Sequence, residues 1–338
     1  MRVGAPSEAG GFLTDGFGRK VNYLRISVTD RCNERCLYCM PEGYKGWAQK
    51  EDHLTADEII CCVEASTRLG FRKIRVTGGE PLIRWDIIEI LERIWELPGV
   101  QTLGVSTNAT RLAGLAPGLK RAGVRSLNIS LDALDPDIYN RITGGRIEAV
   151  MEGIRAAQGE GFEMIKLNCV LLRGLNECQY LPLVEFAALH EMPLRFIELM
   201  PVSKAGVLDD PRFLPVEELF RRLSVRGFLT PRNDFQLGHG PARYYEFRQD
   251  SLPHPAKLGF IGAMTTRHFC EGCNKLRLTA DGKLRPCLGR HGEIDLRGRL
   301  REGGDPVAAI QEAVAGKPEN HKFLEAYEPG RPMTAIGG

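Results

Sequence analysis

Three cysteines lie close together near the start of the chain. Cys32, Cys36 and Cys39 have the spacing C-x3-C-x2-C and directly follow a short apolar run. Three thiolates leave one iron of a 4Fe–4S cluster without a protein ligand, and a small molecule can bind there. The spacing therefore predicts a catalytic cluster. A structural zinc site with His53 as its fourth ligand and an ordinary electron-transfer cluster are the alternatives.

A second group of three cysteines lies late in the chain. Cys270, Cys273 and Cys287 have the spacing C-x2-C-x13-C. We expect a second 4Fe–4S cluster, again with an open iron. The alternative is a zinc site in which His268 or His291 completes the ligand set.

Two cations follow this second group. Lys275 and Arg277 are two residues apart, so on a strand they point to the same side. Asp281 and Gly282 then predict a hairpin turn. Cations beside a cluster predict an anionic ligand, and a solvated charged surface is the alternative.

The other cysteines carry no such pattern. The chain has ten cysteines in all, and a reducing compartment would keep them from forming disulfides. We expect the remaining four to be small buried hydrophobic residues: Cys61, Cys62, Cys169 and Cys178.

Length and composition limit the class of protein. A chain of 338 residues can form a large α/β unit and a smaller one. The formal net charge of +2 gives no general attraction to nucleic acid or membrane. No apolar run reaches the ~18 residues of a membrane span, and the N-terminal segment lacks the apolar stretch of a signal peptide. We expect a cytoplasmic protein without nucleic-acid or membrane partners.

Between residues 20 and 200, β-rich runs alternate with amphipathic segments. We expect helices at 55–69, 83–96 and 177–190, the first beginning with a capping box of Thr55 and Glu58. Six successive βα units predict a parallel sheet. The expected strands are 21–28, 71–77, 101–107, 125–131, 163–171 and 194–199. After Met200 the alternation ends, and the last ~25 residues look loosely structured.

The strands alternate polar and apolar residues, although buried parallel strands are usually apolar throughout. One face of 73–77 carries Lys73, Arg75 and Thr77, and one face of 128–132 carries Asn128, Ser130 and Asp132. A filled barrel would be lined by branched apolar residues. We therefore expect an incomplete (β/α)6 TIM-type barrel with a polar, cationic cavity formed by residues 1–230. Residues 231–338 would form a C-terminal region that carries the second cluster.

The first cysteine group resembles that of the radical S-adenosylmethionine (SAM) superfamily. The resemblance rests on Cys32-x3-Cys36-x-Tyr38-Cys39 and on the turn Gly78-Gly79-Glu80-Pro81 after the second strand. It implies that the open iron binds SAM, which one electron splits into methionine and a 5′-deoxyadenosyl radical. The two glycines would let the backbone approach a ligand closely. Tyr38 would pack beside the adenine, and its alternative role is that of a core aromatic.

The whole pattern resembles the GTP 3′,8-cyclases of molybdenum cofactor biosynthesis. Both cysteine groups, the stretches 25–32, 130–133 and 195–200, and a terminal Gly337-Gly338 carry this resemblance, which runs from about Arg19 to the end of the chain. It implies removal of the 3′ hydrogen of GTP by the deoxyadenosyl radical, followed by bond formation between C3′ and C8. The cofactors implied are two 4Fe–4S clusters and SAM.

The resemblance also implies site residues. Those for SAM are Tyr38, Gly79, Ser130 and Met200. Those for GTP are Arg25, Arg75, Ser106, Lys166, Lys275, Leu276 and Arg277. Lys73 is a candidate proton donor, and Gly337 and Gly338 form a tail that would reach into the active site. In this family arginine is usual at Lys275, threonine at Ser106 and glycine at Ala109, so the bidentate contact at 275 is lost.

Two other functions are compatible with the cysteines. One is a different radical SAM enzyme with an auxiliary cluster, such as a peptide or sulfatase maturase. The other is a metal-binding module without turnover. As partners we expect GTP and an electron donor whose identity the sequence leaves open. The sequence does not fix the oligomeric state, and a homodimer is one assembly that it allows.

Overall fold

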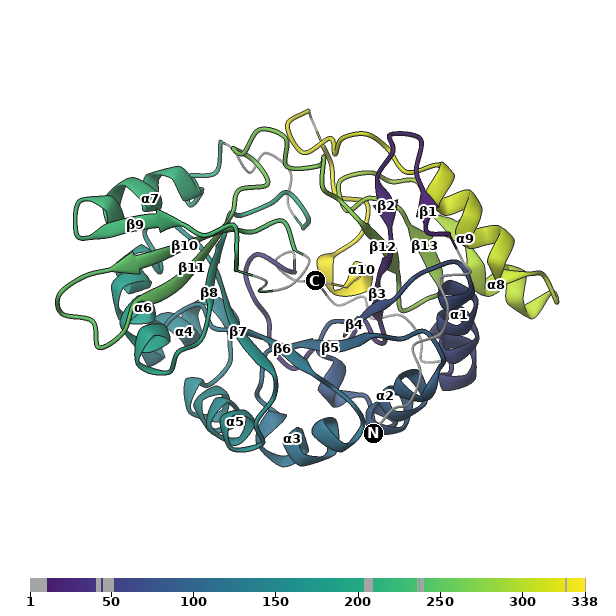
Figure 1. The fold of residues 1–338 in the computed structure, drawn as a ribbon, viewed down its shortest axis with the longest axis horizontal. Coiled ribbons are helices and arrows are strands. Elements are labelled where there is room, and N and C mark those ends of the chain that lie inside the picture. The colour runs from purple at the N-terminus through teal and green to yellow at the C-terminus, as the bar shows by residue number, and fades with distance from the viewer. Residues whose placement is uncertain are drawn as a thin grey trace.

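The computed structural model describes residues 11–40, 44, 52–203, 209–235, 237, 240–325 and 327–337. Its main feature is a twelve-stranded sheet that curves into an open arc (Figure 1). The six strands expected from the sequence lie in its middle, in chain order and parallel to one another. They are β3 (Tyr23–Ser27), β4 (Lys73–Thr77), β5 (Thr102–Thr107), β6 (Ser126–Ser130), β7 (Met164–Val170) and β8 (Leu194–Ile197). The prediction of an incomplete barrel is confirmed.

Helices cover the outer, convex side of these strands (Figure 1). α1 begins with the expected capping box, in which the Glu58 amide donates to Thr55 Oγ1 and the Thr55 amide donates to Glu58 Oε2. The helices are α1 (Ala56–Arg68), η2 (Pro81–Ile83), α2 (Ile87–Glu96), α3 (Leu112–Arg121), α4 (Pro136–Thr143), α5 (Ile147–Gly159), η3 (Glu177–Gln179) and α6 (Tyr180–Leu189). The apolar residues of the strands pack beneath them in one large core.

The C-terminal part of the chain extends the sheet at both ends. β11 pairs in parallel with β8, and β12 pairs in parallel with β3. Antiparallel strands then continue each edge, so the arc is not closed. The strands are β9 (Phe228–Pro231), β10 (Arg243–Arg248), β11 (Ala256–Ile261), β12 (Lys275–Leu278), β13 (Lys283–Arg285) and β14 (Ile294–Asp295). The turn between β12 and β13 is the expected hairpin, with Gly282 at a φ of 80°.

The remaining elements flank the arc or lie within it. They are the hairpin β1 (Leu13–Thr14) and β2 (Lys20–Val21), and the helices α7 (Val216–Ser224), α8 (Leu296–Arg301), α9 (Pro306–Ala315) and α10 (Met333–Ile336). α10 lies inside the arc, close to the sheet (Figure 1). The expectation of a loose C-terminus was wrong, because Phe323, Tyr327 and Ile336 are buried there. Within the described residues, no helix is both long and apolar enough to cross a bilayer.

Candidate active site

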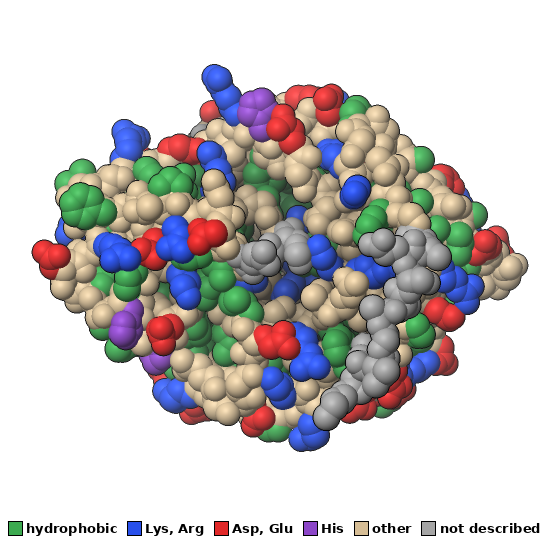
Figure 2. Space-filling model, viewed as in Figure 1, with side chains coloured by type: hydrophobic (Ala, Val, Ile, Leu, Met, Phe, Trp, Pro, Cys, Tyr) green, Lys and Arg blue, Asp and Glu red, His purple; other side chains and the backbone are tan. Residues whose placement is uncertain are grey.

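A large cavity of about 960 Å³ lies on the concave side of the sheet. Its lining includes Arg25, Arg75, Ser106, Ser130 and Lys166, the polar faces of five successive strands. The strand parity thus places side chains as the sequence predicted, with the apolar set in the core and the polar set inside the arc. Lys and Arg side chains are visible within the hollow at the centre of the face in Figure 2.

Both cysteine groups border this same cavity. The loop after β3 carries Cys32, Cys36 and Cys39, and it is fixed to α4 because Arg35 and Leu37 donate backbone hydrogen bonds to residues of that helix. Burial raises the pKa of the Cys32 thiol to about 12, and Cys39 is shifted in the same direction. A coordinating iron deprotonates such thiols outright. Three thiols on one loop facing a cavity are the donor set of a cluster with one open iron.

The turn after β4 fixes the base of this loop. A Cβ on Gly78 would lie 2.6 Å from Thr29 O, and one on Gly79 would lie 2.2 Å from Arg31 O. The glycines are therefore required by the close approach of residues 29–31, in addition to any ligand. Glu80 is buried and accepts hydrogen bonds from the Leu82 amide, the Thr107 hydroxyl and the Asn108 amide. This carboxylate ties the ends of β4 and β5 together.

The residues expected to bind SAM lie beside the first cysteine loop. Tyr38, Gly79, Ser130 and Met200 all line the cavity. The Tyr38 hydroxyl donates to Asp132 Oδ2 at 2.6 Å, while Asp132 Oδ1 accepts from the Val170 amide. The ring also packs on a small apolar cluster that contains Leu199. Tyr38 is therefore packed against an apolar cluster and also borders the cavity, and its place beside the adenine stays a prediction.

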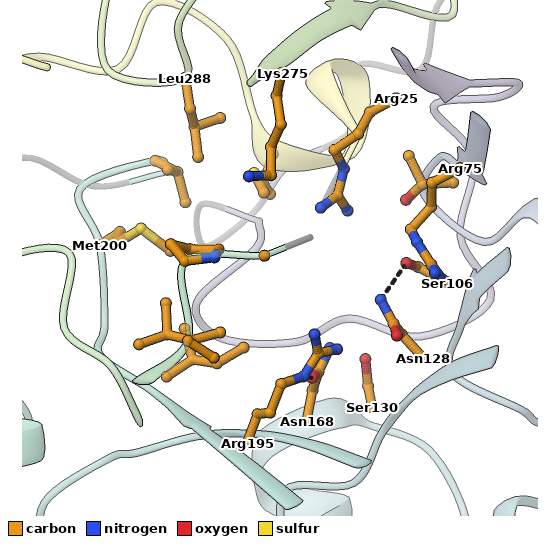
Figure 3. Close-up of a pocket in the computed structure, with 18 of the residues that line it drawn as sticks. Arg25, Arg75, Ser106, Asn128, Ser130, Asn168, Arg195, Met200, Lys275 and Leu288 are labelled. Carbon is orange, nitrogen blue, oxygen red and sulfur yellow. Dashed lines mark hydrogen bonds between the residues drawn. The ribbon is translucent and has the colours of Figure 1, made fainter. Parts of the chain in front are cut away.

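Cationic side chains from four strands converge across the cavity. Arg25, Arg75, Lys275 and Arg195 point into the shared space from different sides in Figure 3. Arg75 is held firmly: its Nε donates to Tyr23 Oη at 2.9 Å, its Nη1 to Val105 O at 3.0 Å and its Nη2 to Ser126 Oγ at 2.8 Å. A buried guanidinium in a fixed orientation suits recognition of phosphate.

Burial and mutual repulsion lower the pKa values of these cations. Burial, followed by Arg195 and Arg75, lowers the pKa of Lys166 to about 7. Burial and then Arg277 lower the pKa of Arg25 to about 9. Burial alone would raise the pKa of Tyr23, but Arg75, Arg25 and Lys275 lower it to about 8. Such a concentration of positive charge in a buried site favours a polyanion.

The second cysteine group lies at the β12 edge of the cavity. Cys270, Cys273 and Cys287 line it, as do Lys275 and Arg277. Leu276 differs from the other candidates, because its side chain is fully buried in the core. Its parity is opposite to that of its two neighbours, so the structure does not bring this side chain to the cavity. Any contact of Leu276 with GTP would have to come from its backbone.

The C-terminal tail enters the arc. Gly337 has a φ of 87°, and a Cβ there would lie 2.9 Å from Thr77 Cγ2 and 3.0 Å from Ser27 Cβ. Its carbonyl accepts a hydrogen bond from Arg277 Nη1 at 2.6 Å. The tail therefore ends against a cation of the candidate GTP site. Gly338, its predicted partner, lies outside the described residues.

The histidines considered as zinc ligands have other neighbours. His53 Nε2 lies 2.9 Å from Asp30 Oδ1, His268 contacts Glu271, and His291 stacks on Tyr327. Within the described ranges, no group of three or more His, Cys, Asp or Glu side chains forms a site for a single metal ion.

All ten cysteines lie in the described part of the chain and none forms a disulfide. Of the four outside the two groups, Cys62 and Cys169 are buried as expected. The expectation was wrong for Cys61 and Cys178, which are exposed. Each is a polarizable side chain at the surface of its helical segment rather than a residue of the core.

Three further residues line the cavity but were not among the residues predicted to bind SAM or GTP. Arg195 lines the cavity and its Nε donates to Asn168 Oδ1 at 2.8 Å. Asn128 Oδ1 is buried and has no hydrogen-bond partner among the described residues, while Asp132 holds Tyr38. Strand parity had placed Asn128 and Asp132 on the interior face. Arg195 could have been found because it is the second residue of β8 and has the same parity as Ile197, which also lines the cavity.

Two other residues named from the sequence, Lys73 and Ala109, lie in the described part of the chain. Lys73 lines the cavity, and burial lowers its pKa. Ala109 keeps the left-handed backbone that favours glycine, with a φ of 64°. The turn is therefore preserved despite the alanine.

Comparison with protein families identifies two matching regions. Residues 26–187 match the model of the radical SAM superfamily, and residues 192–323 match a model described as Molybdenum Cofactor Synthesis C.

Comparison with solved structures gives the same fold. The structure of Streptococcus suis SuiB bound to precursor peptide SuiA matches with a TM-score of 0.60 and 15% identity, over 91% of this chain and 66% of that one. The structure of anSMEcpe with bound AdoMet matches with a TM-score of 0.56 and 15% identity, over 89% and 82%. At this identity the similarity shows the fold alone.

Curated relatives match over nearly their whole length. The GTP 3′,8-cyclase of Pelotomaculum thermopropionicum is 41% identical, with 96% of this chain and 100% of the relative covered. GTP 3′,8-cyclase 2 of Pseudomonas aeruginosa is 40% identical, with 96% and 98% covered. The chain belongs to the GTP 3′,8-cyclase family of radical SAM enzymes.

Proposed function

We propose that this chain binds SAM and GTP in the one cavity and converts GTP into the product with a C3′–C8 bond, the first step of molybdenum cofactor biosynthesis. The observation that supports this most strongly is the arrangement of the cavity. Two groups of three cysteines border it, and a set of buried cations lies between them. The volume of about 960 Å³ is at the upper end of the range for small-molecule sites.

The first cysteine group and its neighbours form the SAM side. Cys32, Cys36 and Cys39 would hold the first cluster, which when bound supplies the electron for the reductive cleavage of SAM. Asp132 orients Tyr38 through a hydrogen bond of 2.6 Å, so the ring has a fixed position against the ligand. Gly79, Ser130 and Met200 complete this part of the lining.

The cations form the triphosphate side. Arg25, Arg75, Lys166, Lys275 and Arg277 come from four different strands, and no phosphate-binding glycine loop of the Gly-x4-Gly-Lys type is present in the sequence. Charge-assisted hydrogen bonds from several strands hold a triphosphate in one orientation. They thereby keep the ribose still, which a radical at C3′ requires if it is to react at C8 and nowhere else.

The second cysteine group would fix the other end of the nucleotide. Cys270, Cys273 and Cys287 would hold the second cluster, whose open iron can bind the guanine. Ser106 and the buried acceptor Asn128 Oδ1 can bind hydroxyl or amino groups of the ligands. Lys73 remains the proposed proton donor for a later step.

We also propose the wider setting of the reaction. A reductase of unidentified kind would supply the electrons. A homodimer is one oligomeric state that the chain could adopt, and this state is to be measured. A cytoplasmic location would keep the clusters and the ten free cysteines reduced. We place the boundary between the SAM unit and the C-terminal region at residues 230 and 231, within β9.

Cluster analysis and assays of SAM cleavage with GTP and with ATP test this function. The anaerobically reconstituted chain should contain about eight iron and eight sulfide, as two 4Fe–4S clusters require. With SAM and reductant it should form 5′-deoxyadenosine with GTP and not with ATP. Stoichiometric zinc in place of iron, or equal 5′-deoxyadenosine with both nucleotides, would contradict the proposal.

The apparent affinity for GTP should fall as the pH rises from 7 to 8. Lys166, with a pKa of about 7, is charged below this pH and must take up a proton on binding above it. The loss approaches tenfold per pH unit, and ionisation of Tyr23, whose pKa is about 8, acts in the same direction. The triphosphate changes its charge little in this range, because the last pKa of a phosphate ester lies at about 6 and loss of that proton would strengthen binding rather than weaken it.

Dissociation constants for GTP at pH 7.0, 7.5 and 8.0 measure this effect. A K166M variant should bind GTP more weakly and show a smaller dependence on pH. An identical dependence in the variant would show that Lys166 does not titrate in this range.

A further inference from the structure

Lys317 is a buried lysine for which the sequence analysis found no role. It follows Gly316, the residue that caps α9, and only 4% of its surface is exposed. Lysine is almost never buried to this degree unless its charge has partners. Its ammonium donates to Lys275 O at 2.9 Å and to Pro286 O at 2.7 Å.

The two carbonyl groups belong to the two segments that carry the second cysteine group. Lys275 is two residues after Cys273, and Pro286 directly precedes Cys287. A single ammonium group therefore connects these segments across 11 residues. The ammonium has three donors, and the two carbonyl groups place it beside the segments that carry Cys273 and Cys287.

The buried ammonium of Lys317 needs a negative partner. The two carbonyl acceptors are neutral, so they offset the cost of a buried ammonium only in part. A 4Fe–4S cluster with three thiolates is a net anion, and it would supply the missing negative charge.

A second cation, Arg19, stabilises the same turn. Arg19 donates to Pro318 O, to Glu319 O and to Cys270 O, and its Nε pairs with Asp15 at 2.6 Å. The backbone next to Lys317 is thus attached to the Cys270 segment. Neither Lys317 nor Arg19 lines the cavity, so both act on the cysteine segments from outside it.

We propose that Lys317 is a positioning residue for the second cluster: it fixes the segments of Cys273 and Cys287 through their backbone carbonyl groups, and its positive charge beside these segments stabilises the reduced cluster. Reduction adds negative charge to the cluster, and a nearby buried cation favours that state. Because Lys317 also holds the carbonyl of Lys275, it sets the position of one candidate GTP cation. This inference rests on the second cluster of the proposed function.

The role of Lys317 is tested by electron paramagnetic resonance. Both clusters are reduced in the anaerobic holoenzyme, and their signals are recorded. The signal that changes on addition of SAM belongs to the first cluster, and the other belongs to the second. K317Q keeps a donor but removes the charge, whereas K317M removes both. K322M is the matched control, because Lys322 is half-exposed and pairs with Glu325.

In both Lys317 variants the ratio of reduced to oxidised second cluster, at a fixed potential, should fall about tenfold, as expected for the loss of one cation next to a charged group. This corresponds to ~59 mV for a one-electron couple. The first cluster should be unchanged, and K322M should behave as the unaltered chain. A chelator should remove iron about tenfold faster from K317M than from the unaltered chain, since that variant loses both backbone contacts.

An unchanged ratio in K317Q would overturn the proposal, and K317Q decides it even if K317M does not fold. Iron analysis of the unaltered chain distinguishes a failure of the proposed second cluster from a failure of the proposed role of Lys317. About four iron per chain would refute the second cluster itself, whereas about eight iron with an unchanged ratio refutes only the role of Lys317.

Discussion

Removal of Gly337 and Gly338 is expected to lower the rate of C3′–C8 cyclisation by about 10- to 100-fold while both clusters remain assembled. Arg277 Nη1 donates to Gly337 O at 2.6 Å, and a charged hydrogen bond of this kind contributes about 1.5–3 kcal/mol. Without the tail, Arg277 loses this partner beside the cavity. The contacts of Gly337 are with Ser27, Thr77, Arg277 and Met333 and not with a cysteine, so iron content should stay at about eight per chain.

Single substitutions make this test sharper. Gly337→Ala keeps the chain length but puts a Cβ 2.9 Å from Thr77 Cγ2 at a φ of 87°, where alanine costs about 1–2 kcal/mol. We expect a rate at least tenfold lower. Gly159→Ala is the matched control, because a Cβ there meets nothing within 4 Å. Unchanged turnover in the truncated chain would refute a role for the tail.

Replacement of Arg75 by methionine should lower kcat/KM for GTP by about 10²–10³. Loss of one partner from a buried charge pair costs about 2–5 kcal/mol, and Arg75 is 8% exposed with three donors held by the protein. Arg75→Lys keeps the charge but not the planar fork, so we expect an intermediate loss of about tenfold.

Steady-state kinetics with GTP, together with SAM cleavage in its absence, measure this effect. Arg93→Met is the control, because Arg93 lies on the outer helix α2 and pairs with Asp57 at the surface. Thermal unfolding of each variant shows whether the fold survives the loss of the Arg75 hydrogen bonds. A folded Arg75→Met variant with normal kcat/KM would exclude Arg75 from the GTP site.

The sequence allowed accurate prediction of features that depend on local pattern. The alternation in 73–77 and 126–130 identified both the strands and the face that lines the cavity, because side chains on a strand alternate with period two. The same rule, applied to 275–278, would have excluded the side chain of Leu276. It lies on the face that packs into the core beside Leu24.

Features that depend on contacts between distant segments could not be predicted. Glu80 joins the ends of two strands, and Lys317 joins two cysteine segments from a third part of the chain. The C-terminal segment looked loose because it has no periodic pattern, yet Phe323 and Tyr327 pack in a small apolar cluster with Met264. Such packing is a property of the assembled fold and leaves no periodic signal in sequence.

GTP deuterated at C3′ provides the most direct test of the central claim, that this cavity directs a radical from SAM to the ribose of GTP. The reconstituted chain, with SAM and reductant, should produce 5′-deoxyadenosine that contains one deuterium per molecule, together with the cyclised nucleotide. Mass spectrometry of the 5′-deoxyadenosine gives the answer. Unlabelled 5′-deoxyadenosine, formed with or without GTP, would contradict the account.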